Sequence, residues 1–210
     1  MNLAFGESDK WKKTVKIIVF ILSLIPFGHL LTLTVIKELG ANPVEKIIHT
    51  TGDWALNFLL VTLSITPLSR IFGWTSLTRF RRMIGLFSIF YASLHFMTYI
   101  GIDKGFSLKA IFEDIVEHKR IIVGFTSFIL LIPLAVTSTN NMVRRLGYNR
   151  WKTLHKLVYI SAIGGVIHYL LLVKKDMQRP MIYAALLLLL LGHRFVIYFF
   201  DSYTRQRKGI

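Results

Sequence analysis

The chain has no cysteine among its 210 residues. This absence excludes structural disulfides, thiolate metal sites, iron–sulfur clusters and the covalent attachment of a c-type haem. The sequence also has no Gly-x-Gly-x-x-Gly motif, so we expect no fused domain that binds a nicotinamide cofactor or FAD. Several common kinds of redox site are therefore excluded from the chain itself.

Acidic residues are scarce, because 11 aspartates and glutamates stand against 26 lysines and arginines, which gives a net charge of +15. The basic residues cluster at the ends of apolar runs, where they would meet lipid headgroups. No nucleic-acid-binding motif and no separate basic domain accompanies them. The charge therefore predicts membrane lipid, and not nucleic acid, as its partner.

Long apolar runs dominate the rest of the chain, which is 53% hydrophobic with a mean hydropathy of +0.53. A membrane-spanning helix needs about 20 such residues. The runs do not alternate with a period of two, so lipid would force them into helices. We predict an all-α membrane protein, a bundle of six transmembrane helices that forms a single domain over residues 1–210, without a visible internal repeat. The predicted spans are Thr14–Ile36, Asp53–Phe72, Arg82–Ile102, Arg120–Thr137, Trp151–Val173 and Met181–Phe200.

The loops alternate in charge. Basic residues predominate at the N-terminus, in the second and fourth loops and at the C-terminus, whereas the first and third loops are balanced by acids. The fifth loop, with Lys174, Lys175 and Arg179, is a mild exception. The positive-inside rule places both termini in the cytoplasm.

The third loop has the pattern of a short amphipathic helix at Ser107–His118, with Leu108, Ile111, Phe112 and Ile115 on one face. The alternative is a plain connector.

Three of the seven histidines, His95, His155 and His168, lie within predicted spans. Ionisable groups inside a membrane are costly and usually functional. Neutral imidazole is the least costly of them to bury, and it is a common axial ligand of haem. His95 and His168 fall in the same half of the bilayer, so we predict that they hold a b-type haem between the third and fifth spans. The alternative for each is a buried, hydrogen-bonded histidine.

His155 precedes His168 by 13 residues, which is roughly 20 Å along a helix and suits a second haem at another depth. Its partner ligand is not evident. We interpret His193 as a weaker candidate ligand, His29 as a hydrogen-bonded interior residue, His49 as the start of a helix and His118 as a solvated loop residue.

The second loop carries the basic run Arg79–Arg82. Membrane topology alone explains such a run. The functional alternative is an anion site around Arg81 and Arg82 for a flavin phosphate, a haem propionate or a quinol headgroup.

Five segments make the chain similar to a known family. They closely resemble the MsrQ family, the haem-binding membrane subunits of bacterial periplasmic methionine-sulfoxide reductases, and more distantly the ferric reductase-like transmembrane domain. The resemblance covers almost the whole chain. Its segments are residues 40–43 (GANP), 63–68 (LSITPL), 81–86 (RRMIGL), 137–139 (TST) and 151–159 (WKTLHKLVY).

The resemblance implies one or two b haems, with His95, His155 and His168 matching the family's haem ligands. Arg81 and Arg82 match paired arginines with a suggested flavin (FMN) or quinone role. It also implies electron transfer from the quinol pool, or from a cytosolic flavin reductase, to a periplasmic molybdopterin methionine-sulfoxide reductase that repairs oxidised periplasmic proteins. The chain would be a non-catalytic subunit of that complex.

Larger ferric reductases carry two histidines on each of two spans, whereas here the position 13 residues before His95 is Arg82 and not a histidine.

Two alternative functions of the chain remain open. One is a stand-alone transmembrane reductase of ferric iron or oxygen, which would need a separate electron donor. The other is a small proton-coupled transporter, in which intramembrane histidines would relay protons.

Overall fold

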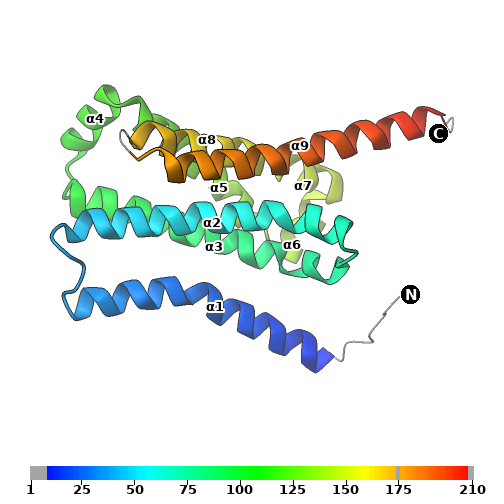
Figure 1. Ribbon diagram of the computed structural model, residues 1–210, viewed down its shortest axis with the longest axis horizontal. Helices are drawn as coiled ribbons and strands as arrows, with labels where there is room; N and C mark the ends of the chain where they lie inside the picture. The colour runs from blue at the N-terminus through cyan, green and yellow to red at the C-terminus, as the bar shows by residue number, and fades with distance from the viewer. Residues whose placement is uncertain (1–8, 174–175, 208–210) are drawn as a thin grey trace.

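The computed structural model describes residues 9–173 and 176–207, and every regular element in these ranges is a helix (Figure 1). Lys174 and Lys175 of the fifth loop lie outside the described residues. Six segments are long and apolar enough to cross a membrane, which confirms the predicted six-helix membrane protein. The spans are formed by α1 (Asp9–Val35), α2 (Pro43–Ile71), α3 (Arg81–Met97), α5 (Lys119–Val136), α8 (Leu157–Leu172) and α9 (Gln178–Arg207), with the short helices η1 (Thr75–Phe80), η2 (Thr98–Asp103) and α7 (Tyr148–Leu154) extending two of them.

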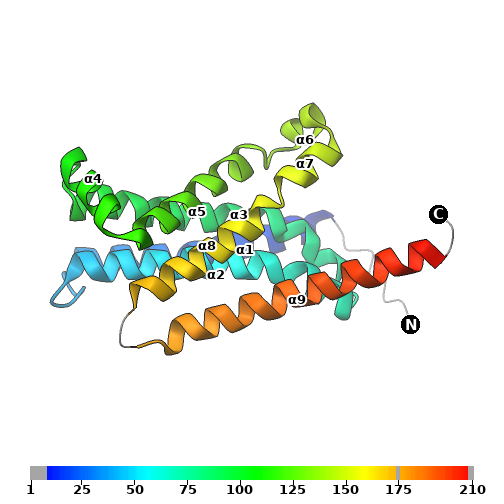
Figure 2. The same ribbon diagram turned by 90° about the horizontal axis from the view of Figure 1, so that it is seen from above.

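The two ends of the bundle differ in what lies across them. At one end, here called the α4 end, α4 (Leu108–Glu117) follows η2 and lies beside the start of α5 (Figures 1 and 2). At the opposite end, the α6 end, α6 (Asn140–Leu146) and α7 connect α5 to α8, and the described parts of both termini lie there as well (Figure 2). The predicted amphipathic helix in the third loop is confirmed by α4.

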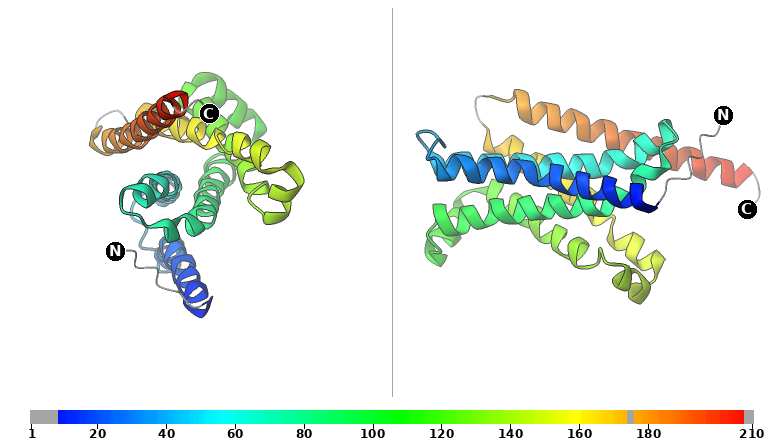
Figure 3. Two further views of the ribbon diagram at one scale, coloured as in Figure 1. Left: turned by 90° about the vertical axis from the view of Figure 1, so that its right-hand side faces the viewer. Right: turned by 90° about the horizontal axis from the view of Figure 1, so that it is seen from below.

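The centre of the bundle is built from two helix pairs. α2 packs along α3, and α5 packs along α8. α1 lies at the edge of the bundle next to α2 and α3, and α9 packs on α8 and α2 (Figure 3). The main apolar core joins the two pairs and consists of Leu56, Leu59, Leu60, Leu63, Leu131, Leu134, Ala162, Val166 and Leu187.

α2 begins at Pro43 and not at Asp53, so the predicted start of the second span is wrong. Asn42 is the reason, because its side chain accepts a hydrogen bond from the Glu45 backbone N at 3.3 Å, and Pro43 supplies a φ angle suited to the first helical position. His49 is consequently an interior residue of this helix, and its interpretation as a helix start is also wrong.

Two spans contain irregular turns next to their histidines. α3 continues beyond Met97 as a π-helical turn, in which Lys104 N donates to Tyr99 O at 3.0 Å. The fifth predicted span is interrupted at His155, because Val158 N donates to His155 O and Tyr159 N to Lys156 O across three residues instead of four. Such irregular turns often accompany functional sites.

Candidate functional site

His95 on α3 and His168 on α8 face each other across the centre of the bundle. Their ring centres are 6.2 Å apart and the ring planes are inclined at 81°. Both rings line a cavity of about 670 Å³ between the two helix pairs. The sequence therefore predicted a pair of residues that the fold does bring together.

The hydrogen bonds of the two rings fix which nitrogen is free. His95 Nδ1 lies 2.9 Å from Ile48 O, and His168 Nδ1 lies 2.7 Å from Arg120 O. A carbonyl oxygen can only accept, so each Nδ1 carries the hydrogen and each Nε2 carries a lone pair. Neither Nε2 has a hydrogen-bond partner among the described residues. This is how metal-binding imidazoles are oriented in proteins, where the second nitrogen donates to an outer-shell carbonyl.

Each ring rests on a glycine of the neighbouring helix. A Cβ atom added to Gly52 of α2 would lie 3.1 Å from His95 Nδ1, and one added to Gly124 of α5 would lie 2.6 Å from His168 Nδ1. Real Cβ atoms do not approach a nitrogen as closely as the second distance. The missing side chains let each imidazole reach the backbone carbonyl four residues earlier on that helix.

The α2–α3 pair and the α5–α8 pair repeat the same set of side-chain contacts. The prediction that the chain has no internal repeat is therefore wrong for these two helix pairs. Ser88 Oγ donates to Ala55 O at 2.9 Å in the first pair, and Ser161 Oγ donates to Ser127 O at 2.8 Å in the second. On α2 and α5 the equivalent residues are 72 positions apart, and on α3 and α8 they are 73 apart. The equivalent residues are Ile48 and Arg120, Gly52 and Gly124, Ala55 and Ser127, Ser88 and Ser161, and His95 and His168.

This repeat is the signal that sequence reasoning missed, since few residues are identical at the fixed offsets, such as Gly52 and Gly124 or His95 and His168, while most residues between them differ. Transporters also contain repeats. Here, however, the repeated parts place one imidazole from each half in the same cavity, with ring centres 6.2 Å apart.

The two histidines and the lining of the cavity between the helix pairs fit an iron porphyrin. Metal–imidazole bonds are about 2 Å long, and each ring centre lies about 1 Å beyond its ligating nitrogen, so two axial imidazoles have their centres about 6 Å apart. The observed separation of 6.2 Å agrees with this geometry. The cavity wall is mainly apolar, and Phe96 stacks on Phe125 and Phe128 beside it. Apolar walls with a few polar groups are typical of cofactor sites.

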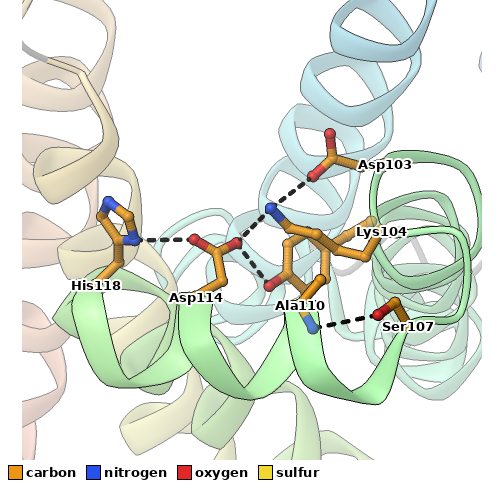
Figure 4. A network of polar contacts seen from close by, with 7 residues as sticks. Asp103, Lys104, Ser107, Ala110, Asp114 and His118 are labelled. Atoms are coloured by element: carbon orange, nitrogen blue, oxygen red, sulfur yellow. Dashed lines mark hydrogen bonds and ion pairs between the residues drawn. The ribbon is translucent and has the colours of Figure 1, made fainter.

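A polar network links η2 to α4 where the cavity reaches the α4 end (Figure 4). Lys104 Nζ lies 2.8 Å from Asp114 Oδ2 and 3.4 Å from Asp103 Oδ2. Tyr99 donates its hydroxyl hydrogen to Asp114 Oδ2 at 2.9 Å, and His118 Nδ1 lies 2.9 Å from Asp114 Oδ1. Asp114 therefore holds α4 against the cavity through Lys104 and Tyr99, while His118 contacts it from the end of α4 itself.

Opposing effects set the charge of this network. Burial raises the pKa of Asp114, but the hydrogen bonds from Lys104 and Tyr99 lower it by more, so that the pKa lies below its usual value. The hydrogen bond to Asp114 raises the pKa of Lys104, against the opposing effect of burial. Both groups are thus held in their charged forms. Sequence reasoning missed this network, because the acid, the lysine and the tyrosine come together only through the π-helical turn.

His155 occupies a different environment near the α6 end. Its ring centre is 4.1 Å from that of Trp151, and its Nε2 lies 3.1 Å from Thr137 Oγ1. Thr137 donates its only hydroxyl hydrogen to Pro133 O at 2.6 Å, so His155 Nε2 must be the donor in the other contact. In this arrangement the free lone pair of His155 is on Nδ1.

A second cavity, of about 340 Å³, adjoins His155. Arg81 and Arg82, the two arginines around which the sequence predicted an anion site, both line it. Its other cationic lining residues are Lys152, Lys156 and Arg194, and no acidic residue lies among its described lining residues. His155 is the one histidine among those residues. Such an unbalanced group of cations favours an anionic ligand.

Arg194 was not predicted, although it lies inside the last span. Its guanidinium donates to Leu63 O at 2.8 Å and to the Tyr159 hydroxyl, and it lies over the Tyr159 ring, 5.1 Å from the ring centre. A charge inside an apolar run is a signal that could have identified Arg194 from the sequence.

Arg82 has contacts of its own in this cavity. It donates to Asn140 Oδ1 at 2.6 Å and lies 5.3 Å from the centre of the Trp151 ring.

Of the other four histidines, His49 also lines the first cavity and His118 belongs to the network around Asp114. His29 is exposed on α1, so its interpretation as an interior residue is wrong. His118 is half-buried at the junction of α4 and α5 and contacts Asp114, and is therefore not a solvated loop residue. His49 Nε2 lies 3.6 Å from a carboxylate oxygen of Glu45. His193 lines neither cavity within the described part of the chain.

Comparison with known proteins relates this arrangement to a family. Residues 51–166 match the family described as "Ferric reductase like transmembrane component". The chain is 47% identical over 191 residues to a protein of Herminiimonas arsenicoxydans, covering 90% of this chain and 88% of that protein. It is 49% identical over 194 residues to one of Rhodospirillum rubrum, covering 92% and 91%, and 51% identical over 157 residues to one of Xanthomonas campestris pv. campestris, covering 74% and 71%. All three relatives bear the name "Protein-methionine-sulfoxide reductase heme-binding subunit MsrQ". The chain therefore belongs to the MsrQ family and, with it, to the ferric reductase-like transmembrane proteins.

Proposed function

We propose that this membrane protein is the haem-binding electron-transfer subunit of a methionine-sulfoxide reductase system, with a b-type haem bound between His95 and His168. The observation that carries the proposal is that the two imidazole rings lie 6.2 Å apart in one cavity, each with its Nδ1 bound to a backbone carbonyl and its Nε2 without a hydrogen-bond partner among the described residues. The names and close similarity of the relatives support the same function. When bound, the haem would supply a centre that accepts and releases one electron at a time.

The chain's own residues would orient the group and keep water away from it. The carbonyls of Ile48 and Arg120 hold the two imidazoles in the tautomer that presents Nε2. Phe96, Phe125 and Phe128 cover one side of the cavity. A low-dielectric, preformed site of this kind reduces the reorganisation that accompanies electron transfer.

We infer an orientation with the α6 end and both termini in the cytoplasm and the α4 end in the periplasm of the bacterial inner membrane. Arg144 and Arg145 of α6 and the basic residues of the second cavity support this orientation. In that orientation the His95–His168 site lies nearer the periplasm. Its electrons would pass to a periplasmic molybdopterin methionine-sulfoxide reductase, which performs the catalysis and thereby repairs oxidised periplasmic proteins.

The second cavity is proposed as the entry point for electrons on the cytoplasmic side. Its cations suit the phosphate of FMN, the headgroup of a quinol or the carboxylates of a second haem near His155. The donor would be the quinol pool or a cytosolic flavin reductase. Haem and flavin contents per polypeptide, measured in the wild type and in His155→Ala and Arg81→Gln, separate these ligands. A loss of haem in His155→Ala would assign a second haem, and a loss of flavin in Arg81→Gln would assign FMN.

The proposal is tested by replacing the histidines one at a time. We expect His95→Ala and His168→Ala to remove the Soret absorbance of the haem between them from the purified protein, because each variant deletes one axial ligand. His29→Ala is the matched control, since His29 is exposed on α1 and contacts neither cavity. Wild-type spectra and haem contents in both variants would contradict the assignment.

A further inference from the structure

Arg120 stands at the edge of the His95–His168 cavity without a partner for its side chain. It is the second residue of α5, is half-buried and lines the cavity at the α4 end. Its backbone carbonyl accepts the hydrogen bond from His168. Its guanidinium has no hydrogen bond or ion pair within the described part of the chain.

This position is unfavourable for a cation in the protein alone. The first turn of a helix carries a partial positive charge, so an arginine there is repelled rather than attracted. A half-buried guanidinium also loses hydration that no neighbouring carboxylate replaces. An arginine at this place therefore needs a reason other than the stability of α5.

The internal repeat shows that orienting the imidazole is not that reason. The residue equivalent to Arg120 in the first helix pair is Ile48, whose carbonyl holds His95 in the same way without any charge. The backbone alone is sufficient for this task. The guanidinium is thus an addition to one half of an otherwise repeated site.

Nearby acids are already engaged by other cations. Asp103 and Asp114 both contact Lys104, and Asp53 Oδ2 lies 3.8 Å from Arg179. Arg120 is the one arginine or lysine lining this cavity that lacks a carboxylate partner among the described residues. The chemistry that matches it is a carboxylate supplied by the ligand, which a planar guanidinium can bind through two hydrogen bonds.

We propose that Arg120 binds a propionate carboxylate of the porphyrin held between His95 and His168, and so turns the edge that bears the propionates towards the α4 end beside α5. This inference rests on the proposed function. The positive charge of Arg120 would offset the negative charge of the propionate. The propionate would then stabilise ferric iron less strongly relative to ferrous iron, which would raise the midpoint potential.

The test uses the purified, haem-loaded full chain and the variants Arg120→Gln and Arg120→Lys. Lys119→Gln is the matched control, because Lys119 is the adjacent cation but is exposed and does not line the cavity. We expect Arg120→Gln to lower the midpoint potential and to release haem to apomyoglobin several-fold faster. Arg120→Lys should recover part of both properties, and Lys119→Gln should match the wild type. Equal potentials and release rates in Arg120→Gln and Lys119→Gln would overturn the inference.

A change in the ligand tests the same contact without altering the protein. Wild-type chain freed of haem is loaded with haem or with its dimethyl ester, in which both propionates are uncharged. We expect the ester to bind more weakly, and the difference between wild type and Arg120→Gln to disappear with it. Equal affinities of haem and ester for the wild type would overturn the role of Arg120 alone. A wild-type chain that binds neither would instead overturn the proposed function.

Discussion

At the scale of single residues, the site depends on two positions where a side chain is missing. Gly52 and Gly124 allow His95 and His168 to lie against the backbone of the neighbouring helices, where each Nδ1 reaches a carbonyl. The histidines could be predicted from the sequence, because an imidazole inside an apolar run is costly and marks a function. The glycines could not, because a glycine in a membrane helix has many uses and only its neighbour shows which one applies.

Alanine substitutions at these glycines should have unequal effects. Gly124→Ala places a Cβ 2.6 Å from His168 Nδ1 and should displace the ring, lowering haem affinity by about tenfold or more, as the loss of an outer-shell hydrogen bond does. Gly52→Ala leaves 3.1 Å and should cost less. Haem retention during titration with apomyoglobin measures both effects.

Gly28→Ala is the control for this series, because Gly28 lies in α1 with no atom within 4 Å of the added Cβ. It should keep its haem and should gain up to about 1 kcal/mol of helix propensity. Retention of haem by Gly124→Ala at the level of Gly28→Ala would show that the close approach is unimportant.

His155 illustrates the limit of sequence reasoning at this scale. Its depth in the chain agreed with a second haem, but its Nε2 donates to Thr137 in the structure and its cavity supplies cations instead of a second histidine. The sequence could identify an ionisable group inside the membrane. The hydrogen-bond partner that decides its chemistry is Thr137, which follows α5 directly and is adjacent to His155 only after folding.

At the scale of elements, α4 joins the polar network around Asp114 to the His95–His168 cavity. Ile111 and Ile115 line the cavity, and Asp114 lies between them, bound to Lys104 and Tyr99. Leu108 also lines the cavity but is 81% exposed, and Phe112, predicted to share the same face, is 68% exposed. The helix itself could be predicted from its apolar period, but which part of that face would be covered depended on the π-helical turn that positions it.

The attachment of α4 should depend on pH through Asp114 and Lys104. Asp114 has a pKa below its unfolded value of about 4, so its contribution is complete above that value and is lost as the pH falls through the lower, folded pKa. Lys104 has a raised pKa, so its contribution is complete below about 10.4 and is lost as the pH rises through the folded pKa. The protection factors of the α4 amides, which compare the measured exchange rate with the intrinsic rate at the same pH, should therefore be high and nearly constant between these limits and should fall below about pH 4.

Asp114→Asn tests whether Asp114 causes the change that we expect below about pH 4. The variant should show α4 protection factors that are a few-fold lower at neutral pH and that change little further on acidification. Glu113→Gln is a suitable control, because Glu113 is exposed and only approaches Lys109 at 3.9 Å. If Asp114→Asn kept the full acid response of the wild type, another group would be responsible for it.

The second span shows how charge can hide an element from sequence reasoning. Glu45, Lys46 and Asp53 make the first part of α2 resemble a loop by hydropathy, whereas the Asn42 cap and Pro43 start the helix there. The early start matters for function, because it places Ile48 and Gly52 on a regular helix beside His95.

At the scale of the whole molecule, the six-helix architecture followed from hydropathy because lipid allows few alternatives. The arrangement of the helices did not follow, since apolar residues surround most of each span and do not indicate which face is internal. The exposure of His29 and the pairing of α2 with α3 and of α5 with α8 are examples.

The orientation in the membrane can be tested because the chain has no cysteine. Lys109→Cys on α4 and Arg145→Cys on α6 each introduce one exposed thiol at opposite ends of the bundle. In intact spheroplasts a membrane-impermeant maleimide should label the first variant fully and the second only after lysis. The reverse pattern would invert the proposed direction of electron transfer.

The most direct measurement of the central claim is the electron paramagnetic resonance spectrum of the oxidised, haem-loaded protein. The geometry of His95 and His168 predicts a low-spin ferric signal typical of two imidazole ligands. That signal should be absent from both His95→Ala and His168→Ala and unchanged in His29→Ala. A wild type without any low-spin signal, or survival of the same low-spin signal at undiminished intensity in either of the two cavity variants, would contradict the haem site described above.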